Sequence, residues 1–179
     1  YWHDKRLFAK EFRTYPTPEE FDAVPWETRR PIAVFRGAST GLGTTLTNNP
    51  RLFFAAESAK KKMDVDGLPF LDAGITKWNL RPRKHPDSRY LETIRVDQMP
   101  FSLVDPQTPL EQASYKYILH LPGHSCAYRL SLELYSGSVV LLYPCEYKLW
   151  FTDALQPWVH YVPLFPTKPE DVYDKIRWC

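Results

Sequence analysis

Apolar positions along the chain fall into short runs separated by polar turns, and the first clear run covers residues 32–35. This β-branched and aromatic stretch predicts a buried strand that ends at Arg36 and Gly37. A polar loop follows over residues 38–45. Residues 50–59 then predict a helix closed by three lysines, because cations suit a helix C-terminus. A strand, a glycine-containing turn and a helix form a βα unit.

A second and clearer unit of this kind lies further along the chain. Residues 115–121 predict a strand, residues 122–125 a turn, and residues 126–135 a helix that Gly137 closes. The next strand is predicted over residues 138–143. Repeated βα units predict a parallel sheet with right-handed crossovers, so the expected fold class is α/β with flanking helices.

Other parts of the chain carry weaker patterns. Thr17 caps a predicted short helix whose buried side carries Phe21 and Val24. Residues 68–75 are a candidate second strand. Residues 81–109 are rich in proline and have little periodicity, which predicts a long loop or insertion with at most one short strand.

Composition narrows the class of protein. Of the 179 residues, 44% are hydrophobic and 25% are charged, which suits one domain or the bulk of a two-lobed one and excludes a disordered or collagen-like chain. The net charge of +2 provides no strong field for a polyanion, so no nucleic acid partner is expected. No run approaches the roughly 18 to 20 apolar residues that cross a bilayer, so no membrane insertion is expected. The start at Tyr1 rather than Met suggests a cut through a longer protein, and the three cysteines indicate no compartment.

Two turns follow predicted strands, at the edge where open α/β sheets bind ligands. Their candidate ligand-binding residues are Arg36, Gly37, Ser39 and Thr40 in the first turn and Gly123, His124, Ser125, Tyr128 and Arg129 in the second. Small residues let backbone N–H groups approach an oxygen-rich ligand, and a helix starting near Cys126 would add the positive end of its dipole. Phosphate is therefore the expected ligand. Arg129, about one turn into that helix, would fork onto the same phosphate as Arg36. The alternative is that both arginines bridge to surface carboxylates and the glycines serve only the turns.

Two other chemistries are weaker interpretations of the second turn. His120, His124 and Cys126 cluster within seven positions, but the strand histidine faces differently from a turn residue and no second cluster supplies further ligands, so no metal site is expected. Ser125 partly matches the nucleophile elbow of serine hydrolases, with Asp153 and His160 later in the chain. That motif lacks its last glycine, because Ala127 stands in its place.

Four blocks of sequence together resemble the CAP10 domain of glycosyltransferase family 90, which holds Rumi-type protein O-glucosyltransferases and O-xylosyltransferases and capsule-associated xylosyltransferases. The blocks are residues 34–41 with Pro50, Arg51 and Leu52; residues 71–78; residues 111–140; and residues 155–164. The first is similar to the family's F-R-G-S-x-T-G with its downstream Arg. The third is similar to its Y-K-Y strand, G-H-x-A-A-x-R turn and G-S-V-V strand.

The resemblance implies a GT-B architecture of two Rossmann-like lobes with the sugar nucleotide in the cleft. Residues 31–179 would be mainly the donor-binding lobe, and residues 1–30 would link to the other lobe or belong to it. The implied activity is metal-independent, inverting transfer of glucose or xylose from UDP-glucose or UDP-xylose to a hydroxyl of a protein or glycan, with no cofactor. The residues of the two turns would bind the nucleotide sugar, and cellular members of the family usually occupy the lumen of the secretory pathway.

The catalytic base is the part of the site that the resemblance does not supply within this chain. The family's catalytic aspartate lies well upstream of F-R-G, in the other lobe, so the base is expected upstream of residue 1. Within the chain, Asp72 and Asp22 are the fallback candidates. A nucleotide-sugar-binding module without a base remains the non-enzymatic alternative.

Overall fold

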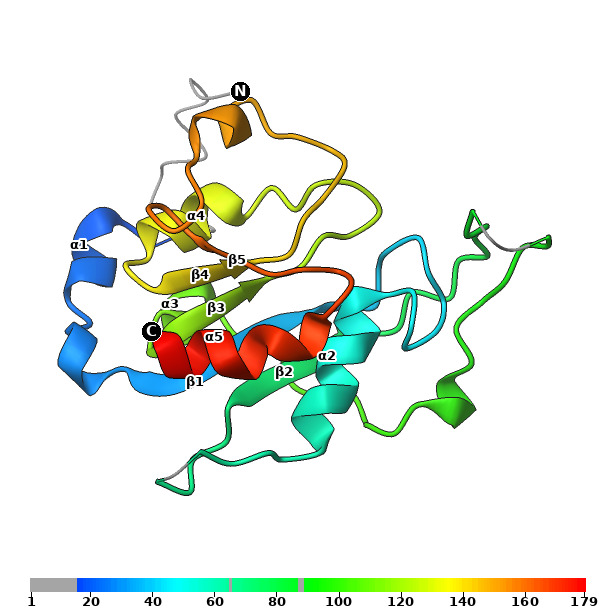
Figure 1. Cartoon of the computed structure of the whole chain (residues 1–179), viewed down its shortest axis with the longest axis horizontal. Helices are drawn as coiled ribbons and strands as arrows, with labels where there is room; N and C mark the ends of the chain where they lie inside the picture. The colour runs from blue at the N-terminus through cyan, green and yellow to red at the C-terminus, as the bar shows by residue number, and fades with distance from the viewer. Residues whose placement is uncertain (1–15, 65, 87–88) are drawn as a thin grey trace.

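The computed structural model describes residues 16–64, 66–86 and 89–179, and a parallel sheet of five strands is its centre. The spatial order is β2-β1-β3-β4-β5, and each neighbouring pair is parallel (Figure 1). The strands are β1 (Arg30–Ala38), β2 (Leu71–Lys77), β3 (Tyr115–His120), β4 (Val139–Leu142) and β5 (Val162–Pro163). The α/β fold class predicted from the repeated βα units is therefore confirmed.

The order of the strands reverses beside β1. The chain passes from β1 to β2 on one side, and then returns to place β3 on the other side of β1. Ligands of open α/β sheets bind at such a switch point, outside the carboxyl ends of the strands. The ends of β1 and β3 and the loops that follow them meet at this place. Arg36 and Gly37, predicted in the first turn, still belong to β1, whereas the second predicted turn follows β3.

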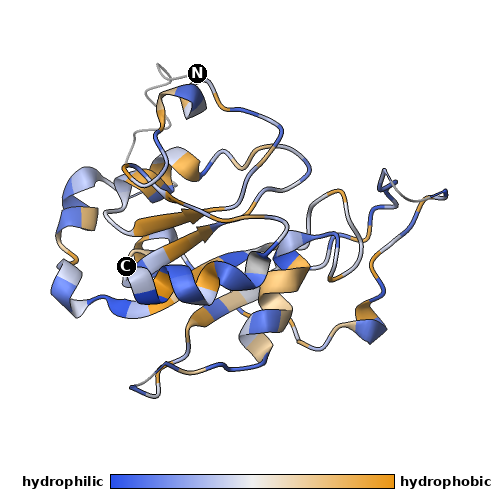
Figure 2. Ribbon diagram, in the orientation of Figure 1, coloured by the Kyte–Doolittle hydropathy of each residue, from blue (hydrophilic) through white to orange (hydrophobic). Residues whose placement is uncertain are grey.

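Helices cover the two faces of the sheet unequally. On one face α2 (Pro50–Ala59) and α5 (Val172–Trp178) pack on the larger apolar core, which Phe35, Leu52 and Leu119 help to build. The other face carries the shorter helices α1 (Pro18–Asp22), α3 (Pro109–Gln112) and α4 (Leu130–Tyr135). Figure 2 shows the apolar colours concentrated in the strands and in α2. The 3₁₀ helices are η2 (Trp26–Thr28), η3 (Val96–Gln98), η4 (Thr152–Ala154) and η5 (Pro169–Asp171).

Residues 16–30 pack on the rest of the fold. Phe21 is buried on α1, as predicted, and its ring lies edge-on to that of Tyr135 at the end of α4. Arg29 donates to the carbonyl of Ser136 at 3.0 Å and to the hydroxyl of Ser138 at 3.0 Å. These bonds attach the N-terminal segment to the turn between α4 and β4. Residues 1–15 lie outside the described residues.

Most predicted elements form close to their expected bounds, and α4 is the exception. The helix predicted over residues 126–135 begins only at Leu130. Leu130 is also the first buried residue after Leu121, whereas Ser125 and Tyr128 are exposed. A helical turn without a buried face is marginal, so residues 126–129 stay in a turn. The region 81–109 contains one antiparallel bridge and η3, in agreement with the predicted irregular loop.

Candidate functional site

Arg51 joins the two turns at the switch point. It stands in the first turn of α2, and its guanidinium donates to the carbonyls of Ala38 at 2.9 Å, Leu121 at 3.0 Å and Pro122 at 2.8 Å. The side chain is buried, so these carbonyls replace the water it would otherwise bind. Burial and the nearby charge of Arg129 lower the pKa of Arg51 to about 9. The loops after β1 and β3 are therefore held together by one cation.

Glycine is required in both turns because other atoms approach closely. A Cβ added to Gly37 would lie 3.0 Å from the Phe35 ring and 3.3 Å from Arg51 Nη1. A Cβ added to Gly123 would lie 2.9 Å from Thr40 Oγ1 and 3.3 Å from Arg51 Nη2. These contacts bring Gly37, Thr40 and Gly123 together around the Arg51 guanidinium, as expected for turns that meet at one site.

Asn49 and Ser39 give the first turn its shape. Asn49 is the N-cap of α2 and accepts from the N–H of Arg51 at 3.0 Å, while its Nδ2 donates to the carbonyls of Gly43 at 3.0 Å and Thr40 at 3.3 Å. Ser39 is fully buried, and its hydroxyl accepts from the N–H of Asn79 at 2.7 Å. This bond gives the Ser39 side chain a place in the scaffold of the turn, and its predicted contact with a ligand stays a prediction.

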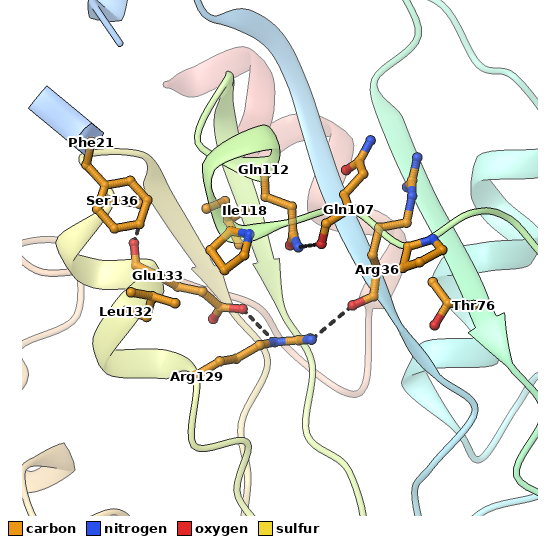
Figure 3. A pocket seen from close by; sticks show the side chains of 12 residues that line it. Phe21, Arg36, Thr76, Gln107, Gln112, Ile118, Arg129, Leu132, Glu133 and Ser136 are labelled. Carbon is orange, nitrogen blue, oxygen red and sulfur yellow. Dashed lines mark hydrogen bonds and ion pairs between the residues drawn. The ribbon is translucent and has the colours of Figure 1, made fainter. Parts of the chain in front are cut away.

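Arg129 lies beside these glycines, held at two edges of its guanidinium. Its Nη1 donates to the carbonyl of Arg36 at 2.9 Å, and its Nε pairs with Glu133 Oε1 at 2.7 Å (Figure 3). Its Nη2 has no hydrogen-bond partner among the described residues. Arg129 is the N-cap of α4 and does not lie one turn into the helix, which corrects the prediction. The terminal nitrogen Nη2 of Arg129 is buried and keeps an unused capacity to donate.

Arg129 also borders a cavity of about 300 Å³ on the face of the sheet that carries the short helices. The cavity lies between α4 and the segment that leads into α3 (Figure 3). Its lining combines apolar side chains with amides and charged groups: Phe21, Arg36, Thr76, Pro106, Gln107, Pro109, Gln112, Ile118, Arg129, Leu132, Glu133 and Ser136.

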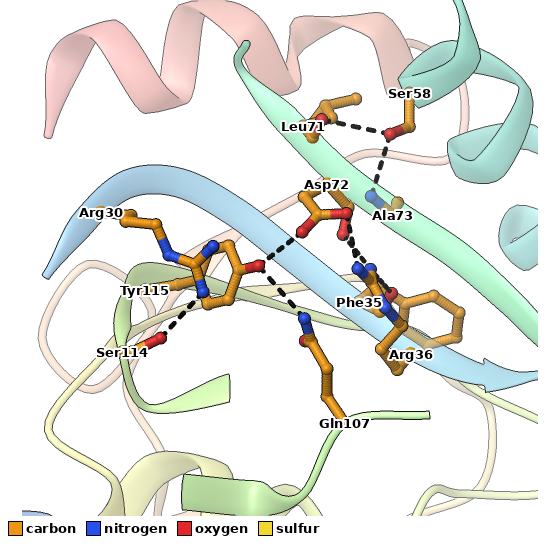
Figure 4. A network of polar contacts seen from close by, with 10 residues as sticks. All are labelled: Arg30, Phe35, Arg36, Ser58, Leu71, Asp72, Ala73, Gln107, Ser114 and Tyr115. Atoms are coloured by element: carbon orange, nitrogen blue, oxygen red, sulfur yellow. Dashed lines mark hydrogen bonds and ion pairs between the residues drawn. The ribbon is translucent and has the colours of Figure 1, made fainter. Parts of the chain in front are cut away.

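Arg36 is engaged by a carboxylate, and its binding to the same phosphate as Arg129 stays a prediction. Its Nη2 pairs with Asp72 Oδ1 at 2.7 Å, and its Nη1 donates to the Asp72 carbonyl at 2.6 Å (Figure 4). The Tyr115 hydroxyl donates to the other Asp72 oxygen at 2.5 Å, and burial together with this bond raises the pKa of Tyr115. The alternative interpretation, an arginine bridging to a carboxylate, describes Arg36.

The two fallback carboxylates have different surroundings. Asp72 is the second residue of β2, and its carboxylate is held by Arg36 and by the Tyr115 hydroxyl. Asp22 is exposed at the end of α1, which packs beside the last residue of α4 (Figure 1). Neither side chain is brought to the residues around Arg51.

The remaining predicted residues of the second turn differ in exposure. His124 is half-buried near Gly41, and burial and the charges of Arg83 and Arg81 lower its pKa, so it is neutral at physiological pH. Ser125 and Tyr128 are exposed, the latter 77%. They extend the rim of the site toward solvent.

The two weaker interpretations of the second turn, a metal site and a serine hydrolase, find no matching cluster of side chains in the described part of the chain. His120 is buried and binds Glu133 Oε2 through Nδ1 at 2.5 Å, and the described residues contain no group of three or more His, Cys, Asp or Glu side chains that could hold a metal ion. The proposed hydrolase acid, Asp153, pairs with Lys148 at 2.6 Å. The proposed base, His160, accepts from the N–H of Gln156 at 2.9 Å, so both are occupied locally.

Asn49 and Glu133 belong to the candidate site although sequence reasoning did not select them, and Arg51 was matched to the family's downstream Arg without being assigned a role. Arg51 had a signal, because a cation in the first turn of a helix opposes the helix dipole and therefore suggests another task. Asn49, directly before a proline at the first helical position, had the signal of an N-cap. Glu133 had no such signal, since a lone Glu in a helix is usually solvated.

None of the helices in the described part of the chain has the length and apolar character that a membrane span needs.

Comparisons with known proteins agree with this arrangement. The sequence model of "Glycosyl transferase family 90" matches residues 17–179. The chain is 44% identical over 168 residues to "Uncharacterized protein 179R" of Invertebrate iridescent virus 6, covering 87% of this chain and 14% of that protein. It is 26% identical over 159 residues to "O-glucosyltransferase rumi" of Drosophila melanogaster, covering 86% and 32%.

A shorter match joins the chain to "Protein O-glucosyltransferase 2" of Danio rerio, with 42% identity over 65 residues that cover 36% of this chain and 13% of that protein. The chain therefore spans a third or less of the length of each of these relatives. The match of the family model extends over nearly all the described residues, including both turns and every strand. The chain belongs to glycosyl transferase family 90.

Proposed function

We propose that this chain binds the nucleotide sugar in a glycosyltransferase that transfers glucose or xylose from a UDP-sugar to a hydroxyl of a protein or glycan. The observation that carries the proposal is the meeting of the two glycine-containing segments at the switch point, where Arg129 Nη2 has no hydrogen-bond partner among the described residues. Backbone close to an arginine donor is suited to the oxygens of a diphosphate.

The proposed reaction is one displacement at the anomeric carbon. The acceptor oxygen forms a bond to the anomeric carbon while the bond between that carbon and the β-phosphate oxygen breaks. The configuration at the carbon is thereby inverted. A base takes the acceptor proton, and UDP leaves with an added negative charge. Arg129 would stabilise that charge, so no metal ion is required in this scheme.

The names of two relatives support a glucosyltransferase, and both proteins are much longer than this chain. Transfer is accordingly proposed for the protein as a whole, with this chain contributing the donor site. The Asp72 carboxylate is held by Arg36 and the Tyr115 hydroxyl, and Asp22 is exposed at the end of α1, which favours a base outside the described residues. The same observation favours the second candidate function, a nucleotide-sugar-binding module without catalysis.

Calorimetric titration with UDP tests the proposed binding, and release of sugar from radiolabelled UDP-glucose and UDP-xylose tests transfer. We expect UDP to bind in the presence of EDTA as tightly as in its absence. Failure of UDP and of both UDP-sugars to bind would refute the donor site. Binding that requires added Mn²⁺ or Mg²⁺ would refute the metal-free scheme. Binding without transfer in the complete protein would favour the non-catalytic module.

A further inference from the structure

Glu133 is a buried carboxylate that touches two of the residues discussed above. Its Oε1 pairs with Arg129 Nε at 2.7 Å, and its Oε2 bonds to His120 Nδ1 at 2.5 Å. We propose that Glu133, anchored by His120, is a positioning residue that holds Arg129 in the orientation that binds the UDP diphosphate. This inference rests on the proposed donor site.

The geometry restricts the guanidinium of Arg129 on two of its edges. Glu133 binds Nε, and the carbonyl of Arg36 at the end of β1 binds Nη1 at 2.9 Å. A planar guanidinium fixed at two nitrogens cannot rotate freely, so the direction of the third is set before a ligand arrives. Such preorganisation saves the ordering cost that a free arginine would incur on binding.

His120 restricts Glu133 in turn. The histidine ends β3, and both side chains are about as buried as the apolar core, with 5% and 7% of their surfaces exposed. Burial alone would raise the pKa of Glu133, but Arg129 and His120 lower it further than burial raises it. Glu133 therefore remains a carboxylate at neutral pH, anchored to a strand by one oxygen and to Arg129 by the other.

Charge and geometry predict opposite effects of removing this carboxylate. Glu133 reduces the positive charge around Arg51 and Arg129, so a charge effect alone would make an anion bind more tightly after Glu133→Gln. Loss of orientation would make it bind more weakly. A role limited to stability would lower the melting temperature and leave UDP affinity unchanged.

The experiment measures UDP dissociation constants by calorimetry for the wild-type chain, Glu133→Gln and Glu133→Asp. The aspartate keeps the charge but is one methylene too short to reach Arg129 and His120 together, and it serves if the glutamine variant does not fold. We expect about a tenfold weaker affinity for both, from the loss of a well-oriented charge-assisted bond.

Glu57→Gln is the matched control. Glu57 is also a carboxylate with 7% of its side chain exposed, and it pairs with Lys62 and accepts from the Tyr173 hydroxyl on the opposite side of the sheet. Its replacement removes a buried charge of the same kind, so it reports the cost to stability. We expect UDP affinity equal to that of the wild type.

A double-mutant cycle separates the inference from the proposed function. If Glu133 acts through Arg129, Glu133→Gln causes no further loss of affinity in an Arg129→Ala background. Unchanged or tighter UDP binding by both Glu133 variants overturns the inference while leaving the donor site intact. Absence of UDP binding by the wild type overturns the donor site, and the inference with it.

Discussion

Arginine side chains make most of the polar contacts around the two turns, and each arginine is used differently. Arg51 is buried and donates to three backbone carbonyls, and Arg36 is paired with Asp72. Arg129 alone of these three is held at two edges with a terminal nitrogen unpartnered among the described residues. The partners available at each position, rather than the residue type, separate a structural arginine from one available to a ligand.

Replacement of Arg129 by alanine is the first test at this scale. Arg129→Ala is expected to weaken UDP binding by about 2 kcal/mol, because a charge-assisted bond to a phosphate oxygen is lost. The measurement is calorimetric titration with UDP on a variant whose far-UV circular dichroism matches that of the wild type.

Arg177→Ala provides the matched control for this arginine. Arg177 pairs with Asp174 on the exposed side of α5, so its loss removes the same charge without touching the turns. UDP affinity is expected to stay within twofold of the wild type, about 0.4 kcal/mol. Equal affinities of Arg129→Ala, Arg177→Ala and the wild type would exclude Arg129 from the donor site.

At the scale of the element, the start of α2 shapes the site more than its length does. Asn49 caps α2 and also holds the turn after β1 through the carbonyls of Thr40 and Gly43. Arg51, two residues later, binds the turn after β3. A single helix start thus connects both turns, and a defect there affects stability and ligand binding together.

Asn49→Ala is expected to lower the free energy of unfolding by about 2 kcal/mol, because it removes the cap of α2 and the bonds from Asn49 to the carbonyls of Thr40 and Gly43, of which the second keeps a weaker bond from Arg83. It is also expected to weaken UDP binding, since the first turn loses its anchor. Urea denaturation and UDP titration measure the two effects.

Thr108→Ala is the control that separates the loss of a helix N-cap from the loss of the contacts by which Asn49 holds the first turn. Thr108 is an N-cap on the exposed start of α3, where its hydroxyl accepts from the N–H of Glu111 at 3.2 Å. This variant is expected to cost about 1 kcal/mol of stability and to leave UDP affinity unchanged. A similar loss of UDP affinity in both variants would show that the link between α2 and the site is wrong.

At the scale of the whole molecule, the two faces of the sheet have different tasks. The face covered by α2 and α5 holds the larger apolar core. The face with the short helices borders the cavity and Arg129 (Figure 3). Each face buries one carboxylate, Glu57 on the first and Glu133 on the second. Both therefore contribute to the response of the fold to acid.

Stability is expected to fall as the pH drops below about 4.5, the ordinary value for glutamate. Burial raises the pKa of Glu57, but bonds from Lys60, Tyr173 and Lys62 lower it further, and the pKa of Glu133 is also lowered. A carboxylate with a lowered pKa in the folded state stabilises the fold above its unfolded value, and this contribution is lost as pH falls through the folded value. Urea denaturation at a series of pH values measures the effect.

Glu57→Gln tests the assignment of this acid sensitivity. The variant is expected to be less stable than the wild type at neutral pH and to lose less additional stability on acidification, because one of the titrating groups is gone. Parallel curves of unfolding free energy against pH for the two proteins would contradict it.

The sequence by itself determined the local elements and the place of the site. Apolar runs such as residues 32–35 form strands in this fold because they bury side chains in any parallel sheet, and a turn after such a strand must lie at the carboxyl edge. The two predicted ligand-binding segments do lie side by side, but the first turn begins later than predicted, because Arg36, Gly37 and Ala38 still belong to β1. These features depend on contacts within a few residues, or on the rules that govern all α/β sheets.

Only the tertiary structure decided which side chains face the site. Arg36 pairs with Asp72 because β1 and β2 are adjacent, and Arg129 reaches the Arg36 carbonyl because the segment after β3 lies beside β1. These two contacts join residues 36 and 93 positions apart, and their cost or gain depends on burial and on the partners that the packing provides. A sequence pattern states neither the burial of a side chain nor its partners. The partners of each buried charge are therefore known only from the assembled strands and helices.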